Sequence, residues 1–151
     1  MIITFLGHRS IHTIDEVRKK LEHTIAQNLK SDEKTLFYCG GYGTFDNLCA
    51  SVCHAFRKRE LPCEVVYITP YITESHQKKM KDLLETKLYD SVIYPPLEST
   101  PLKYAIIKRN EWMIQQADLI IAYVDHSHGG AYKSLVYAEK KQKKIINLTE
   151  L

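Results

Sequence analysis

The sequence predicts an α/β fold, a doubly wound and mainly parallel sheet of about six strands with helices on both faces. Two observations support this prediction. Apolar runs of strand length recur along the chain, and most are continuous, as in strands covered on both faces. Between them lie segments whose apolar residues follow helical spacing. Such β-α alternation favours parallel neighbours joined by right-handed crossovers.

The predicted strands are the six apolar runs, which cover residues 1–6, 35–39, 63–69, 91–94, 118–124 and 144–148. The predicted helices are the segments with one apolar stripe, which cover residues 14–29, 45–56, 80–88, 106–117 and 131–138. A proline-rich stretch at residues 94–101 reads as a loop between a strand and a helix. Because no linker or repeat interrupts this order, we expect one domain over residues 1–151.

The composition, 44% hydrophobic and 26% charged over 151 residues, fits one compact domain. No apolar run approaches the roughly 18 residues of a membrane span, and the N-terminus lacks the features of a secretory signal. We therefore expect a cytoplasmic protein without membrane contact. The net charge of +3 arises from basic residues interspersed with acids. Nucleic acid is therefore an unlikely partner on sequence grounds.

Neither the cysteines nor the histidines predict a metal site. The cysteines form no CxxC pair and are explained as small buried thiols; they are Cys39, Cys49, Cys53 and Cys63. A loop after the fifth predicted strand carries Asp125, His126 and His128, whose spacing could hold a metal. Loop histidines without a metal are commoner, so we expect none.

All six glycines fall in three loops that follow predicted strands; they are Gly7, Gly40, Gly41, Gly43, Gly129 and Gly130. In open parallel sheets, ligands bind outside the carboxyl ends of the strands. The glycines therefore predict a binding site at that edge of the sheet.

The stretch YCGGYGTFDN has three glycines within four positions, between a strand ending near Cys39 and a helix beginning near Thr44. Unpaired N–H groups at a helix start bind anions, and glycines allow a phosphate to approach. We therefore predict that the phosphate lies against residues of this loop; they are Gly40, Gly41, Tyr42, Gly43 and Thr44. The alternative is a tight turn in which Thr44 or Asp46 starts the helix. The P-loop GK[ST] and the dinucleotide GxGxxG spacing are both absent.

The first loop offers Gly7 for close approach, His8 as a titrating group and Arg9 to counter a phosphate charge. The alternative is a surface turn that caps the first helix. Arg109 and Asn110 interrupt the apolar stripe of the fourth helix near the same edge. They are expected either to reach the ligand or to form a solvated helix face.

The last glycine loop repeats the logic of an anion site. Gly129 and Gly130 precede a helix, and Tyr132 is available to stack on a base or to line the pocket. We expect these three residues to close the second side of the site.

Four motifs together, TFLGHR, GGYGTFD, KRNEWMIQQADLIIAYV and GGAYKSLVYA, resemble small bacterial members of the SLOG superfamily. This Rossmann-like group includes the Lonely Guy enzymes and the DNA-processing protein DprA. The resemblance covers nearly the whole chain. It implies a nucleotide or nucleotide-derived ligand held by the glycine-rich loops, no required cofactor, and a homodimer paired through helices beside the site.

The chain departs from the enzymes of this superfamily at both known catalytic carboxylates. The glutamate of the Lonely Guy GGxGTxxE motif falls on Asn47, with Asp46 one place earlier, and the glutamate of deoxyribosyltransferases falls on Ser134. We therefore expect a binding or sensing domain for a small nucleotide derivative, without appreciable hydrolysis. An N-glycosidic enzyme using Asp46 or Asp125 is the first alternative. A DprA-like DNA-associated module is the second, although no basic stripe with interleaved aromatics supports it.

Overall fold

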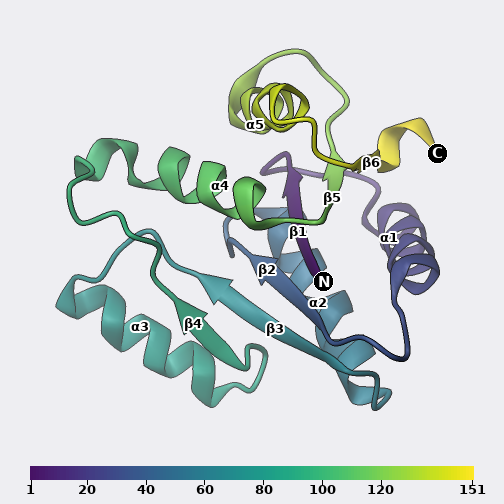
Figure 1. The fold of residues 1–151 in the computed structure, drawn as a ribbon, viewed down its shortest axis with the longest axis horizontal. Coiled ribbons are helices and arrows are strands. Elements are labelled where there is room, and N and C mark those ends of the chain that lie inside the picture. The colour runs from purple at the N-terminus through teal and green to yellow at the C-terminus, as the bar shows by residue number, and fades with distance from the viewer.

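The computed structural model describes residues 1–151 as one six-stranded sheet in the order β4-β3-β2-β1-β5-β6 (Figure 1). Every neighbouring pair of strands is parallel. The strands are β1 (Ile2–Gly7), β2 (Thr35–Cys39), β3 (Cys63–Ile68), β4 (Ser91–Ile93), β5 (Leu119–Tyr123) and β6 (Ile145–Asn147). The predicted strands are confirmed, and their ends differ from the observed ones by at most one residue.

Five α-helices cover the sheet in two layers. They are α1 (Ile14–Asn28), α2 (Thr44–Lys58), α3 (Glu74–Glu85), α4 (Ala105–Gln116) and α5 (Gly129–Lys140). Two short 3₁₀ turns, η1 (Leu102–Tyr104) and η2 (Leu148–Glu150), precede α4 and follow β6. None of the helices combines the length and the apolar character that crossing a membrane requires.

The side chains of β1 alternate between two core clusters, and these clusters show which helices cover each face of the sheet. Ile3 and Phe5 belong to the large core cluster, which also contains buried residues of α1, α2 and α3. Leu6 belongs to a second cluster with buried residues of α4 and α5. Successive side chains of a strand point to opposite faces, so α1 to α3 cover one face, and α4 and α5 cover the other. The predicted doubly wound fold, with helices on both faces, is confirmed.

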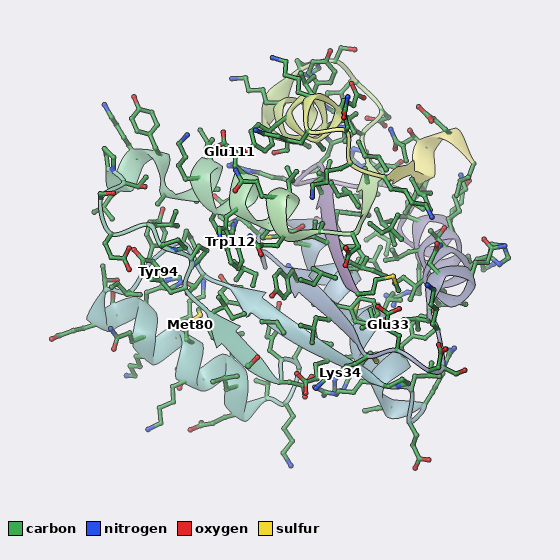
Figure 2. All side chains as sticks on the ribbon, in the orientation of Figure 1. Glu33, Lys34, Met80, Tyr94, Glu111 and Trp112 are labelled. Atoms are coloured by element: carbon green, nitrogen blue, oxygen red, sulfur yellow. The ribbon has the colours of Figure 1, made fainter.

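Helix α4 lies across the sheet with two distinct sides. Figure 2 shows Trp112 on the side of α4 toward the strands and Glu111 on the side toward α5. The Trp112 ring stacks on Tyr38 of β2, with centroids 5.8 Å apart. Since Trp112 holds α4 on the sheet, the opposite side of the helix remains free to face α5.

The strand order reverses at β1, which is the third strand counted from the β6 edge of the sheet. From β1 the chain runs outward through β2, β3 and β4, and then crosses back to add β5 and β6 on the other side. The chain segments that follow β1 and β5 lead to helices on opposite faces of the sheet, α1 and α5, which places a crevice at the carboxyl ends of these two neighbouring strands. All six glycines lie at this edge, as the sequence predicted, although only three of them lie in a loop. Gly7 ends β1, Gly40, Gly41 and Gly43 follow β2, and Gly129 and Gly130 begin α5.

Candidate functional site

A cleft of about 800 Å³ lies over the carboxyl half of β1, between α4 and α5. Its walls come from β1 and the loop after it, the glycine loop at residues 40–43, one side of α4, and the start of α5. The cleft therefore sits at the point where the strand order reverses, where doubly wound folds bind their ligands.

Most of the residues that the sequence predicted for a site line this cleft. They are Gly7, His8, Arg9, Gly40, Tyr42, Asp46, Arg109, Asn110, Gly129 and Gly130. Four others lie outside its lining; they are Gly41, Gly43, Thr44 and Tyr132. Tyr132 instead packs beside the buried cluster shared by α4, α5 and β5.

The glycine loop at residues 40–43 is shaped by contacts within the protein. A Cβ on Gly41 would lie 2.3 Å from the Tyr67 ring, and a Cβ on Gly43 would lie 2.8 Å from the Arg9 Cα. Both glycines also have positive φ angles, 65° and 97°. The three clustered glycines thus admit neighbouring protein groups, whereas the sequence argument had assigned this room to a phosphate.

Two N–H groups of this loop already have partners within the protein. The Thr44 N–H donates to the Arg9 carbonyl at 2.8 Å, and the Tyr42 N–H donates to Asp46 Oδ2 at 3.0 Å. The first hydrogen bond fixes the loop after β1 against the start of α2, and the second fixes the glycine loop against the same helix. They leave less of the α2 N-terminus available for an anion than the sequence suggested.

The first turn of α5 is open to the cleft. Gly129 and Gly130 line the cleft, and a Cβ on either would meet no atom within 4 Å. His128, at the N-cap position, makes no side-chain capping hydrogen bond. N–H groups of a first helical turn have no partner within the helix. The backbone N–H groups of this turn therefore face open space in the cleft. At Gly130, no neighbouring protein atom lies close enough to exclude a side chain.

Arg109 is 2% exposed and is held by the protein itself. Its Nη1 donates to the carbonyl oxygens of Gly40 at 2.9 Å and Ile68 at 2.8 Å, and its Nε donates to Asn110 Oδ1 at 2.8 Å. Burial lowers the Arg109 pKa, and the nearby Asp46 carboxylate opposes that shift. Arg109 contributes to the cleft wall, and its guanidinium positions the loops after β2 and β3.

Asp46 is half-buried and lines the cleft from the first turn of α2. Desolvation raises its pKa to about 6, against the opposing effects of the Tyr42 N–H and Arg109. Asn47, in the register of the Lonely Guy glutamate, is exposed and outside the cleft lining. Ser134, in the register of the deoxyribosyltransferase glutamate, does line it.

One pair of a cation and an exposed aromatic ring lies at the edge of the cleft, and a second pair lies directly before α4. The Arg9 guanidinium lies over the Tyr42 ring, 4.6 Å from its centroid, and both residues line the cleft. Lys103 Nζ lies 5.0 Å from the centroid of the Tyr104 ring. Tyr104 directly precedes α4, whose exposed Ile107 lines the cleft. Tyr42 is 48% exposed and Tyr104 is 46% exposed, so both rings are accessible from outside.

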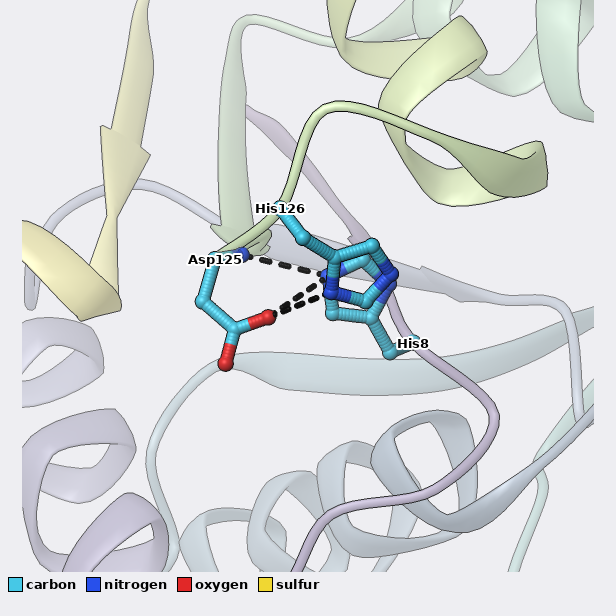
Figure 3. A group of neighbouring side chains, drawn as sticks. All are labelled: His8, Asp125 and His126. Carbon is cyan, nitrogen blue, oxygen red and sulfur yellow. Dashed lines mark hydrogen bonds and ion pairs between the residues drawn. The ribbon is translucent and has the colours of Figure 1, made fainter.

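The loops after β1 and β5 meet in a cluster of His8, Asp125 and His126 (Figure 3). Asp125 Oδ1 lies 3.2 Å from His8 Nε2 and 2.7 Å from His126 Nδ1. The two imidazole rings stack with centroids 3.6 Å apart. Burial, followed by the neighbouring His126, lowers the His8 pKa. The hydrogen bond with His126 lowers the pKa of Asp125.

One side of α5 supplies cleft residues that the sequence argument overlooked. Lys133, Ser134 and Tyr137 line the cleft together with Gly130. Their spacing of three and four positions places them on the same side of the helix. The sequence shows this spacing, but it does not show whether this side of the helix faces a cleft or the solvent.

No family model matches the chain, and no curated protein is similar to it in sequence. Solved structures that resemble its fold include two DNA-processing proteins. DNA processing protein A from Helicobacter pylori, described for its single-stranded DNA binding mode, gives a TM-score of 0.64 at 17% identity over 96% of this chain. DprA from Streptococcus pneumoniae gives 0.61 at 12% identity over 95%. This chain spans 63% and 48% of their lengths.

These neighbours contradict two predictions made from sequence. The interpretation as a sensing domain for a small nucleotide derivative is wrong, and so is the view that nucleic acid is an unlikely partner, because both neighbours are DNA-processing proteins. The physical reason is that the spacing of basic and acidic residues along the sequence does not determine which of them lie together on the folded surface. Folding brings Arg9 beside the ring of Tyr42, a pairing that the sequence does not show as a continuous basic stripe.

Proposed function

We propose that this chain is a DprA-like module of the SLOG superfamily that binds single-stranded DNA in the cleft over β1. The observation that carries the proposal is the pairing of Arg9 with the exposed Tyr42 ring at the edge of an 800 Å³ cleft. The fold likeness to DNA processing protein A, one example of which binds single-stranded DNA, supports the same reading.

The phosphate backbone is expected to run along the α5 side of the cleft. The open first turn at Gly129 and Gly130 has free N–H donors, and Lys133 adds an exposed cation one turn further on. Helix N-termini favour anions through these donors and through the helix dipole. Arg9 supplies a second cation on the opposite wall.

The bases are expected to stack on the exposed rings of Tyr42 and Tyr104. Unpaired bases stack on aromatic side chains with little regard to sequence, and an adjacent cation strengthens such a platform. Arg9 and Lys103 occupy that position beside the two rings. Bases within a duplex are already stacked on each other, so we expect a preference for single strands.

The test measures binding of a fluorescently labelled oligothymidylate by anisotropy at several salt concentrations. Arg9→Ala should weaken binding about ten-fold and reduce the slope of log affinity against log salt by about 0.7, the value for one lost phosphate contact on a single strand. The matched control is Arg59→Ala. Arg59 also lies over an aromatic ring, Phe56, at 4.7 Å, but it is far from the cleft at the end of α2.

Arg59→Ala should leave both the affinity and the salt slope unchanged. The proposal fails if the wild-type protein does not retain the oligonucleotide at low salt, or if the two arginine variants lose affinity equally. An unlabelled duplex that competes as well as the single strand would also contradict it.

A further inference from the structure

We propose that His8, Asp125 and His126 form a binding site for one divalent transition-metal ion at the wall of the cleft. The three residues come from two loops that are separated by 117 positions between His8 and Asp125. They meet only because β1 and β5 are neighbours at the point where the strand order reverses. This site does not depend on the proposed binding of DNA.

The ligand atoms already lie at distances suited to a shared ion. His8 Nε2, Asp125 Oδ1 and His126 Nδ1 all lie within 4.8 Å of one another. The carboxylate oxygen is 3.2 Å from the first nitrogen and 2.7 Å from the second. Ligands of a tetrahedral zinc ion with bonds of 2.0–2.1 Å are about 3.3 Å apart. The two rings are stacked with their planes 10° apart, so their lone pairs do not yet converge on one point. Binding therefore requires the exposed His126 ring to rotate out of the stack and direct its nitrogen at the ion.

Both histidine nitrogens face Asp125 (Figure 3). His8 Nε2 accepts a hydrogen bond from the Asp125 backbone N–H at 3.1 Å. In a neutral imidazole, one ring nitrogen is the acceptor and the other carries the proton. When His8 Nε2 accepts this hydrogen bond, the neutral ring carries its proton on Nδ1 and the Nε2 lone pair is on the side that faces Asp125. An ion would replace the N–H as the partner of this lone pair.

Two imidazoles and one carboxylate define the class of ion. Imidazole nitrogen suits Zn²⁺, Co²⁺, Ni²⁺ and Cu²⁺, whereas Mg²⁺ and Ca²⁺ require mainly oxygen ligands. The centroid of the His128 ring lies 4.1 Å from that of the His126 ring, so His128 is close enough to supply a further ligand. His8 and His126 line the cleft, whereas Asp125 does not. The remaining coordination position of the ion is therefore open toward the cleft.

The experiment titrates the metal-free protein with Co²⁺ alone and follows its visible absorption. Wild type should bind one equivalent and develop the strong bands of a four- or five-coordinate ion. His126→Ala and Asp125→Asn should each raise the dissociation constant at least ten-fold. Both side chains are exposed, so these variants are expected to fold, and circular dichroism checks that they do. His23→Ala, which removes an exposed histidine of α1, should bind as wild type does.

The inference is overturned if wild type shows no strong bands, or if it binds Co²⁺ no better than His126→Ala. Equal losses in His23→Ala and His126→Ala would also overturn it, since they would reveal binding by scattered histidines. Inorganic phosphate added to the Co²⁺ protein should shift the bands by occupying the open position. Bands that do not move with phosphate would contradict an open position facing the cleft.

Discussion

The Arg109 guanidinium donates a hydrogen bond to the Gly40 carbonyl oxygen at 2.9 Å, across 69 positions of sequence. The same Nη1 also reaches the carbonyl oxygen of Ile68. One buried cation on α4 therefore ties together the ends of β2 and β3, and it lies close to Asp46 at the start of α2. The shape of the cleft floor depends on this residue.

Arg109→Met should destabilise the protein by about 3 kcal/mol, because it leaves two buried carbonyl oxygens without their donor and removes the cation beside Asp46. Urea unfolding followed by circular dichroism measures the change. Lys108→Met is the matched control on the same helix. Lys108 is exposed and pairs with Glu111 at 3.1 Å, so its loss should cost less than about 0.5 kcal/mol. Equal effects of the two variants would contradict the positioning role of Arg109.

Asp46 should make stability depend on pH. Its pKa is about 6 in the folded protein and 3.8 in an unperturbed side chain, so the folded state holds the proton more tightly. Stability from this residue is therefore fully present below about pH 4 and is lost as the pH rises through about 6. The loss is at most about 3 kcal/mol for a shift of this size.

Comparing wild type with Asp46→Asn in urea from about pH 4 to pH 7 isolates this effect. The variant should gain stability relative to wild type across that interval, and the difference should level off above it. Asp15→Asn, which alters an exposed aspartate in the first turn of α1, serves as control and should follow the wild-type curve. Parallel curves for Asp46→Asn and wild type would refute the elevated pKa.

The sequence predicted the fold well because buried parallel strands have continuous apolar runs, whatever their partners. Residues 35–39 were predicted with the observed bounds, and the parallel direction followed from the helices between strands. The order of the strands was not predictable in the same way. Nothing in the apolar runs states that β5 lies beside β1, and this neighbour relation determines where the cleft opens.

The edge that carries the candidate site was predictable, but the contacts within it were not. A glycine in the sequence indicates that another group approaches the backbone closely, but it does not show whether that group is a ligand or a part of the protein. At Gly41 the approaching group is the Tyr67 ring, whereas at Gly130 the protein offers nothing within 4 Å. The pairings of Arg9 with Tyr42 and of His8 with Asp125 likewise join segments far apart in sequence.

Gly41→Ala and Gly130→Ala should therefore have opposite effects on stability. The new methyl group at position 41 would lie 2.3 Å from the Tyr67 ring and would require a φ of 65°. This variant should lose about 2 kcal/mol or more. Gly130 lies in the first turn of α5 with open space around it, so alanine should stabilise the protein by about 0.5–1 kcal/mol.

The Gly130→Ala variant should also bind the oligothymidylate about ten-fold more weakly, because its methyl group occupies space that the phosphate would need. Thermal unfolding and fluorescence anisotropy on the same samples separate the two effects. A Gly130→Ala protein that is more stable and binds with full affinity would contradict the path of the backbone along α5.

Tyr42 provides the last prediction, since its ring is the most exposed aromatic surface of the cleft at 48%. Tyr42→Ala should weaken oligothymidylate binding between about 5-fold and 150-fold, the range for one stacked base. Tyr42→Phe should bind nearly as wild type does, because the ring, and not the hydroxyl, carries stacking. The salt slope should change less in Tyr42→Ala than in Arg9→Ala, since a ring contacts no phosphate. If Tyr42→Phe binds as weakly as Tyr42→Ala, the hydroxyl group is the contact, and the stacking platform is refuted.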